Sequence, residues 1–191
     1  HTIWSPGRDR LPTSGAGAFW ERRERFPMGG SVFNDADRLG IATLHLLRHV
    51  VRNNLRLAHA YEVSRMMGNL EADAWRRWEI HPPELRQMES IAMKFASIWF
   101  NVPLPDAARA SWESLPRPVQ EWMDAHAFAP VENLESPNKQ VLWLHLALLP
   151  RWQDRVAVAR RRLLPKLPSR EQATDPRHLW TRGRFHAVAL A

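Results

Sequence analysis

The side chains with the clearest capacity for chemistry stand close together, between residues 45 and 62. His45 and His49 are four residues apart, and Arg48 and Arg52 have the same spacing. Residues three and four apart lie on one face of a helix, so these groups would line one edge, with Glu62 on the next helical stretch. The imidazole pair has a possible metal-ligand spacing, and the arginines could hold a phosphate or carboxylate through two parallel hydrogen bonds.

One hypothesis from this spacing is a metal-dependent hydrolase that uses His45, His49 and Glu62. The zinc-protease pattern requires Glu directly after the first histidine, but Leu46 occupies that position. We therefore assign no metal site, and we expect a histidine on the helix edge that is hydrogen-bonded to backbone or to Glu62. The chain also has no Gly-rich phosphate loop, and we assign no catalytic residue.

The elements that must position these groups are helices. Ile41, Leu44, Leu47 and Val51 form an apolar stripe at helical spacing, and a polar break at residues 52–54 separates this helix from a second one. Asn34 or Asp35 is expected to cap the first helix, with Asp37 in its first turn. Further helices are expected at residues 15–26, 71–79, 84–99, 106–113, 119–126, 140–149, 152–164 and 178–188.

Two of these expected helices also carry burial predictions. The stretch 140–149 is apolar almost all round, which is typical of a buried helix. In the stretch 152–164, we expect four residues to face inward: Trp152, Val156, Ala159 and Leu163.

Together the patterns predict an all-α fold, an irregular multi-helix bundle of about seven or eight helices with little or no sheet. We divide the chain into an extended N-terminal segment with a short helix (1–33), a helical domain (34–168) and a basic C-terminal tail (169–191). The absence of cysteine excludes disulfides and thiol catalysis. No run of eighteen apolar residues occurs, so we expect no membrane span and a cytoplasmic location.

The net charge of +7 arises in residues 150–191, which hold ten Lys or Arg and three Asp or Glu. In residues 1–149 the two signs cancel. Because Arg suits phosphate and carboxylate groups, one interpretation is a basic helical module that binds nucleic acid or an acidic partner. The other is a solvated or partner-facing basic helix. The contacts of the binding module would be Arg155, Arg160, Arg161 and Arg162.

Six short motifs also follow one another along the chain. They are His1-Thr-Ile-Trp4, Phe19-Trp-Glu-Arg-Arg23, Leu44-His-Leu-Leu-Arg-His49, Arg56 to Met67, Ile98 to Pro105 and Arg160 to Glu171. In this order they resemble the C-terminal helical half of the uncharacterised nucleotidyltransferase family, which belongs to the polymerase-β-like nucleotidyltransferase superfamily. The motifs are short and degenerate, and Glu62 stands where the family usually has Asp.

The resemblance implies an acceptor-side helical domain whose partner is a catalytic nucleotidyltransferase domain upstream. The Gly-Ser loop and Asp-x-Asp pair that bind NTP and Mg²⁺ are absent here, so we expect no cofactor in this chain and no activity from it alone. A start at His1 rather than Met is typical of a fragment or a processed product. Carried over by position, Arg48, His49, Arg52 and Glu62 would bind substrate, with a phosphate-containing group at Arg48 or Arg52.

Overall fold

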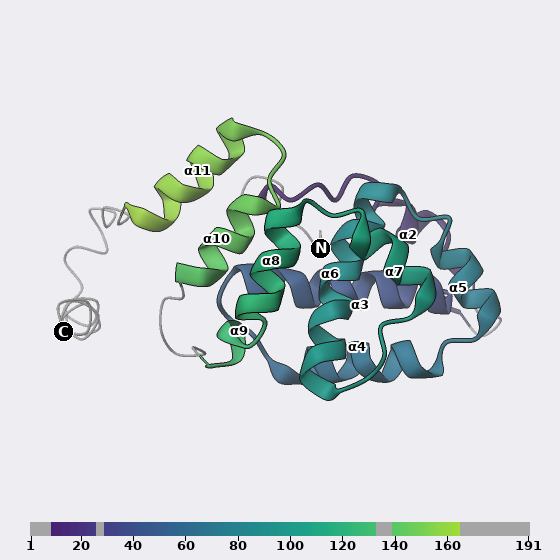
Figure 1. Ribbon diagram of the computed structural model, residues 1–191. Helices are drawn as coiled ribbons and strands as arrows, with labels where there is room; N and C mark the ends of the chain where they lie inside the picture. The colour runs from purple at the N-terminus through teal and green to yellow at the C-terminus, as the bar shows by residue number, and fades with distance from the viewer. Residues whose placement is uncertain (1–8, 26–28, 133–138, 165–191) are drawn as a thin grey trace, which may run out of the picture. The chain divides into compact units, whose positions relative to one another are not determined.

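The computed structural model describes residues 9–25, 29–132 and 139–164, and most of these are helical (Figure 1). The ten helices in these ranges are α2 (Ala18–Glu21), α3 (Asp35–Val51), α4 (Leu57–Asn69), α5 (Ala72–Trp78), α6 (Pro83–Phe100), α7 (Asp106–Glu113), α8 (Arg117–His126), α9 (Ala129–Glu132), α10 (Lys139–Ala147) and α11 (Trp152–Leu163). Strands β1 (Glu24–Arg25) and β2 (Ser31–Val32) form an antiparallel pair. The all-α prediction is confirmed.

The chain divides into two units, residues 1–158 and 159–191, with the boundary inside α11. The first unit contains the hydrophobic core. Of the second unit the structure describes residues 159–164, the end of α11 and one residue beyond it. The helix expected at residues 178–188 lies outside the described ranges. Within those ranges, no helix combines the length and the apolar character needed to cross a membrane.

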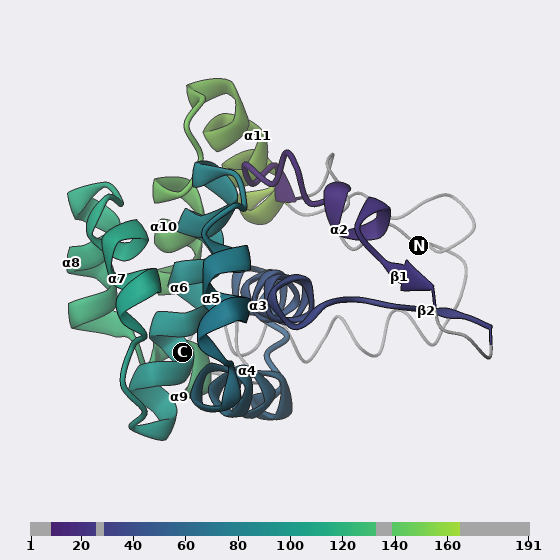
Figure 2. The same cartoon turned by 90° about the vertical axis from the view of Figure 1, so that its right-hand side faces the viewer.

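Helix α3 is the element around which the first unit is built, because it packs against α4, α5, α6 and α10. Its start is set by Asn34, whose side-chain oxygen accepts a hydrogen bond from the backbone N–H of Asp37 at 2.9 Å. Leu44, Leu47 and Val51 of the predicted stripe are fully buried. Helices α3 and α4 run alongside each other in opposite directions, and Figure 2 shows both nearly end-on.

Helix α6 forms the second wall of the core, with contacts to α3, α4 and α7. Proline at its first position needs no backbone N–H partner, and Asn101 ends the helix in a left-handed conformation with φ 51°. Leu85, Ile91 and Phe95 lie on the core side of this helix and are completely buried.

A buried polar network joins the start of α3 to α6. The Nε2–H of His81 donates to Asp37 at 3.1 Å, and one proton lies between His81 Nδ1 and Glu89, also at 3.1 Å. Arg22 covers the outer side of Asp37 with a 2.5 Å ion pair. Burial raises the pKa of Glu89, and the hydrogen bond from His81 opposes that rise. The network therefore satisfies polar groups that the core encloses.

Three sequence expectations need correction. The helix expected at residues 15–26 is only α2, because Glu24 and Arg25 pair with β2 instead. In α10, Trp143 is 62% exposed although the sequence is apolar all round. In α11, Trp152, Val156 and Leu163 are exposed rather than facing inward. Helical spacing identified the helices, but which side each turns to the core depends on neighbours distant in sequence.

Candidate functional site

Three imidazoles meet where α3 ends and α4 begins. His45 and His49 lie one turn apart on α3, and His59 comes from the first turn of α4. The ring centroids are 4.5 Å apart for His45 and His49, 4.5 Å for His45 and His59, and 4.8 Å for His49 and His59. All three side chains are half-buried. We call these three residues the imidazole cluster.

The turn between the two helices explains how His59 reaches the cluster. The backbone N–H of Arg52 closes the last turn of α3 on the carbonyl of Arg48, and Asn53 then adopts a left-handed conformation with φ 55°. Asparagine tolerates this conformation better than most residues. The chain reverses direction in this short break, and the first turn of α4 returns alongside the last turns of α3.

Hydrogen bonds indicate which ring nitrogen of His45 and of His49 carries the proton. Arg48 can only donate, so the 3.4 Å contact with its guanidinium makes His45 Nδ1 an acceptor and puts the proton on His45 Nε2. That Nε2–H donates to His49 Nε2 at 3.1 Å. The Nδ1–H of His49 in turn donates to the carbonyl oxygen of Asn54 at 2.9 Å. The three contacts form one continuous chain from Arg48 to the turn.

The surroundings favour the neutral form of two of these rings, His45 and His59. Burial, followed by the charges of His49, His59, Arg48 and Arg56, lowers the pKa of His45 to about 4. Burial also lowers the pKa of His59, again with a contribution from both arginines. At neutral pH His45 and His59 therefore present uncharged nitrogens beside the positive charges of Arg48 and Arg56.

The predicted site residues are only partly brought together. Arg52 forms a two-pronged ion pair with Asp9, in which Arg52 Nε donates at 2.9 Å. Asp9 is 3% exposed, so the positive charge of Arg52 is largely neutralised by the protein itself. Arg48 and His49 do belong to the site.

Glu62 lies close enough for its charge to oppose the lowered pKa of His59, but it is exposed. The hydrolase hypothesis expected Glu62 as the third metal ligand beside His45 and His49. The structure instead places His59 close enough to these two histidines to share a metal ion with them. Sequence reasoning missed His59 because it looked for a carboxylate. The only sequence signal was a third histidine just beyond a short helix break.

The four arginines of the alternative basic module all lie on α11. Arg155 Nε donates to the backbone oxygen of Leu149 at 2.8 Å, which ties this side chain to the end of the preceding helix segment. Arg160 is exposed, and Arg161 and Arg162 follow it in the last turn of α11. The tail beyond residue 164 lies outside the described part of the chain.

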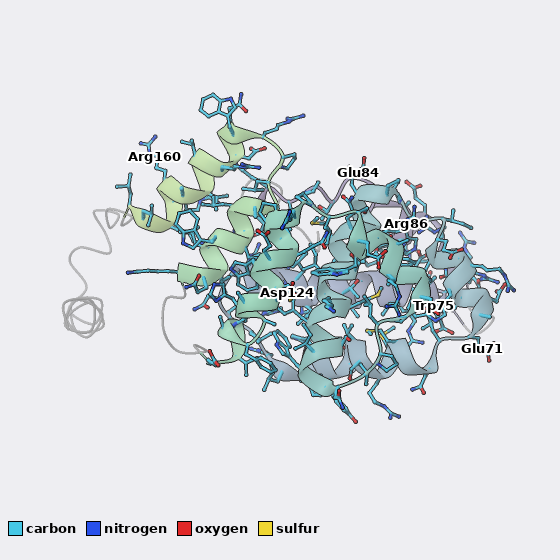
Figure 3. All side chains as sticks on the ribbon, viewed as in Figure 1. Glu71, Trp75, Glu84, Arg86, Asp124 and Arg160 are labelled. Atoms are coloured by element: carbon cyan, nitrogen blue, oxygen red, sulfur yellow. The ribbon has the colours of Figure 1, made fainter. Side chains whose placement is uncertain are left out.

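Concave surfaces occur elsewhere in the described ranges. A pocket of about 350 Å³ is lined by residues of α6, α8 and α9, among them Lys94, Asp124 and His126 (Figure 3 labels Asp124). A second, of about 280 Å³, is lined by acidic residues that include Glu71 at the start of α5 (Figure 3). The Arg77 guanidinium lines the second pocket and is paired there with the protein's own carboxylates. Neither pocket contains a residue of the imidazole cluster.

Comparisons of the chain with known protein families, with curated proteins and with solved structures found no match.

Proposed function

We propose that the chain is the acceptor-side helical domain of a nucleotidyltransferase-like protein, and that the α3–α4 junction binds a phosphate-bearing ligand. The observation that carries the binding proposal is the concentration of positive charge around His45 and His59. Arg48 and Arg56 both lower the pKa of His45 and of His59. A bound anion would relieve this unfavourable interaction, and the arginine forks suit phosphate oxygens.

The resemblance supports the same location. Two of its motifs, Leu44 to His49 and Arg56 to Met67, occupy the facing ends of α3 and α4. Arg48, His49 and Arg56 come from these motifs. Arg52 contributes indirectly, because its pair with Asp9 fixes the end of α3, whereas Arg48 contacts the His45 ring directly.

Calorimetric titration of the full chain with inorganic phosphate and with ATP tests the binding proposal. Replacing Arg48 or Arg56 by Gln removes a charge-assisted hydrogen bond and should weaken binding about tenfold or more. Arg109→Gln is the matched control, because Arg109 is an exposed arginine of α7 that pairs with Asp106. Equal affinity in all three variants, or no binding by the wild-type chain, would contradict the proposal.

The domain assignment has a separate test. The reading frame upstream of His1 should encode a mixed sheet with a Gly-Ser loop and an Asp-x-Asp pair. The longer protein should then transfer a nucleotide in the presence of Mg²⁺, whereas this chain alone should not. An upstream frame without those two motifs would remove the assignment while leaving the phosphate result intact.

A second proposal, a basic binding module in residues 150–191, rests on the surface of α11. Trp152 is 68% exposed and Val156 54%, beside Arg155 on the same helix. Exposed apolar side chains with flanking arginines are typical of surfaces that bind an acidic partner or nucleic acid. Retention on heparin should fall steeply with salt and be lost when Arg155, Arg160, Arg161 and Arg162 are replaced by Ala. Salt-insensitive retention would argue against this module.

A further inference from the structure

We propose that His45, His49 and His59 form a three-histidine site for a divalent transition metal ion of the zinc class. This site does not depend on the nucleotidyltransferase assignment. One ring nitrogen from each histidine can be chosen so that all three lie within 4.8 Å of one another. Three imidazoles are a ligand set that zinc accepts, with a water or an anion in the fourth position.

The distances within the cluster suit such an ion. The Nε2 atoms of His45 and His49 are 3.1 Å apart. Two nitrogens bound tetrahedrally at about 2.0–2.1 Å from zinc lie about 3.3 Å apart, so this pair needs to open only slightly. His59 closes the triangle from the other helix, and its ring already touches both partners.

The His49 ring already has the orientation and the proton position that a metal ligand needs. Its Nδ1–H donates to the carbonyl oxygen of Asn54, which leaves the lone pair of Nε2 directed into the cluster. A backbone carbonyl on the second ring nitrogen is the usual way in which proteins orient a metal-binding histidine. The turn that contains Asn53 and Asn54 thus orients the His49 ring and also places His59 beside it.

His45 must change its proton position to bind a metal. Its Nε2 carries the ring proton as long as Nδ1 accepts from Arg48. Metal binding moves that proton to Nδ1 and displaces Arg48, whose 3.4 Å contact is the longest in the hydrogen-bonded chain. No net proton is released, because the ring is neutral before and after.

The charges around the imidazole cluster favour an anion as the fourth ligand of the metal ion. Arg48 and Arg56 oppose a cation, although solvent screens them because the cluster is only half-buried. The Glu62 carboxylate offsets part of this charge near His59. An anion in the open position would neutralise both the ion and the arginines, so we expect phosphate to bind more tightly when the metal is present.

Equilibrium dialysis of the full chain against Zn²⁺ alone, in phosphate-free buffer, provides the primary test. The wild-type chain should bind one ion, and His45→Ala, His49→Ala and His59→Ala should each weaken that binding about 100-fold or more. His126→Ala on α8 is the matched control and should bind like wild type. Co²⁺ in place of Zn²⁺ should give the visible bands of a four-coordinate ion, lost in His59→Ala.

Two further variants sharpen the result. Arg48→Gln removes the competing donor and one positive charge, so it should tighten Zn²⁺ binding while weakening phosphate binding. Glu62→Gln should leave the Zn²⁺ affinity within about threefold of wild type, because Glu62 is not a ligand. Wild-type binding well below one ion per chain would overturn the site, as would unchanged affinity in His59→Ala. The wild-type stoichiometry decides the question even if a histidine variant fails to fold.

Discussion

Gly40 is the position where a single added methyl group should reveal how tightly the core is closed. It lies inside α3, where alanine is intrinsically favoured over glycine by about 1 kcal/mol. A Cβ at this position would nevertheless lie 2.7 Å from Phe19 Cζ, 2.9 Å from Glu89 Oε1 and 3.2 Å from His81 Cε1. All three neighbours are buried, so none can move into solvent.

The expected magnitude follows from these contacts. Overpacking a closed core costs about 1–3 kcal/mol, and disturbing a buried hydrogen bond to a charged group costs about 1.5–3 kcal/mol. Part of this is offset by the helix propensity of alanine. We therefore expect Gly40→Ala to lower the free energy of unfolding by about 2 kcal/mol, and the melting temperature by about 4–8 °C.

Gly68→Ala is the matched control for this experiment. Gly68 is also helical, in α4, but a Cβ there would meet no atom within 4 Å. This variant should be as stable as wild type or up to about 1 kcal/mol more stable. Urea denaturation followed by circular dichroism measures both variants under the same conditions. A Gly40→Ala protein at least as stable as wild type would refute the closed packing of α3 against Phe19, His81 and Glu89.

Two further predictions concern buried charge. Arg52→Ala should lower the free energy of unfolding by about 3 kcal/mol or more, because it leaves the Asp9 side chain, which is 4% exposed, without its partner. Adding Asp9→Asn should restore much of the loss. An Arg52→Ala variant as stable as wild type would contradict the importance of this ion pair. Glu89 has a raised pKa in the folded protein. The stability that this group contributes is therefore fully present below its ordinary pKa of 4.5, and it is lost as pH rises through the pKa of the folded state. Glu89→Gln should therefore gain stability relative to wild type as pH rises above 4.5, measured by urea midpoints at several pH values, and a pH-independent difference would count against the shift.

The helices themselves could be predicted from local signals, because those signals act within a few residues. Asn34 before an apolar stripe, proline at the start of α6 and the spacing of Leu44, Leu47 and Val51 each specify backbone geometry independently of the rest of the chain. The pairing of His45 with His49 follows from helical periodicity in the same way.

Tertiary structure decided which groups meet across the chain. The position of His59 beside His45 depends on how sharply the chain turns at Asn53, and periodicity within one helix carries no information about that turn. The pair of Arg52 with Asp9 spans 43 residues, and the contact of His81 with Asp37 spans 44. Such contacts form because a buried polar group must find a partner wherever packing places one, and the meeting of His59 with the α3 histidines likewise emerged only from the fold.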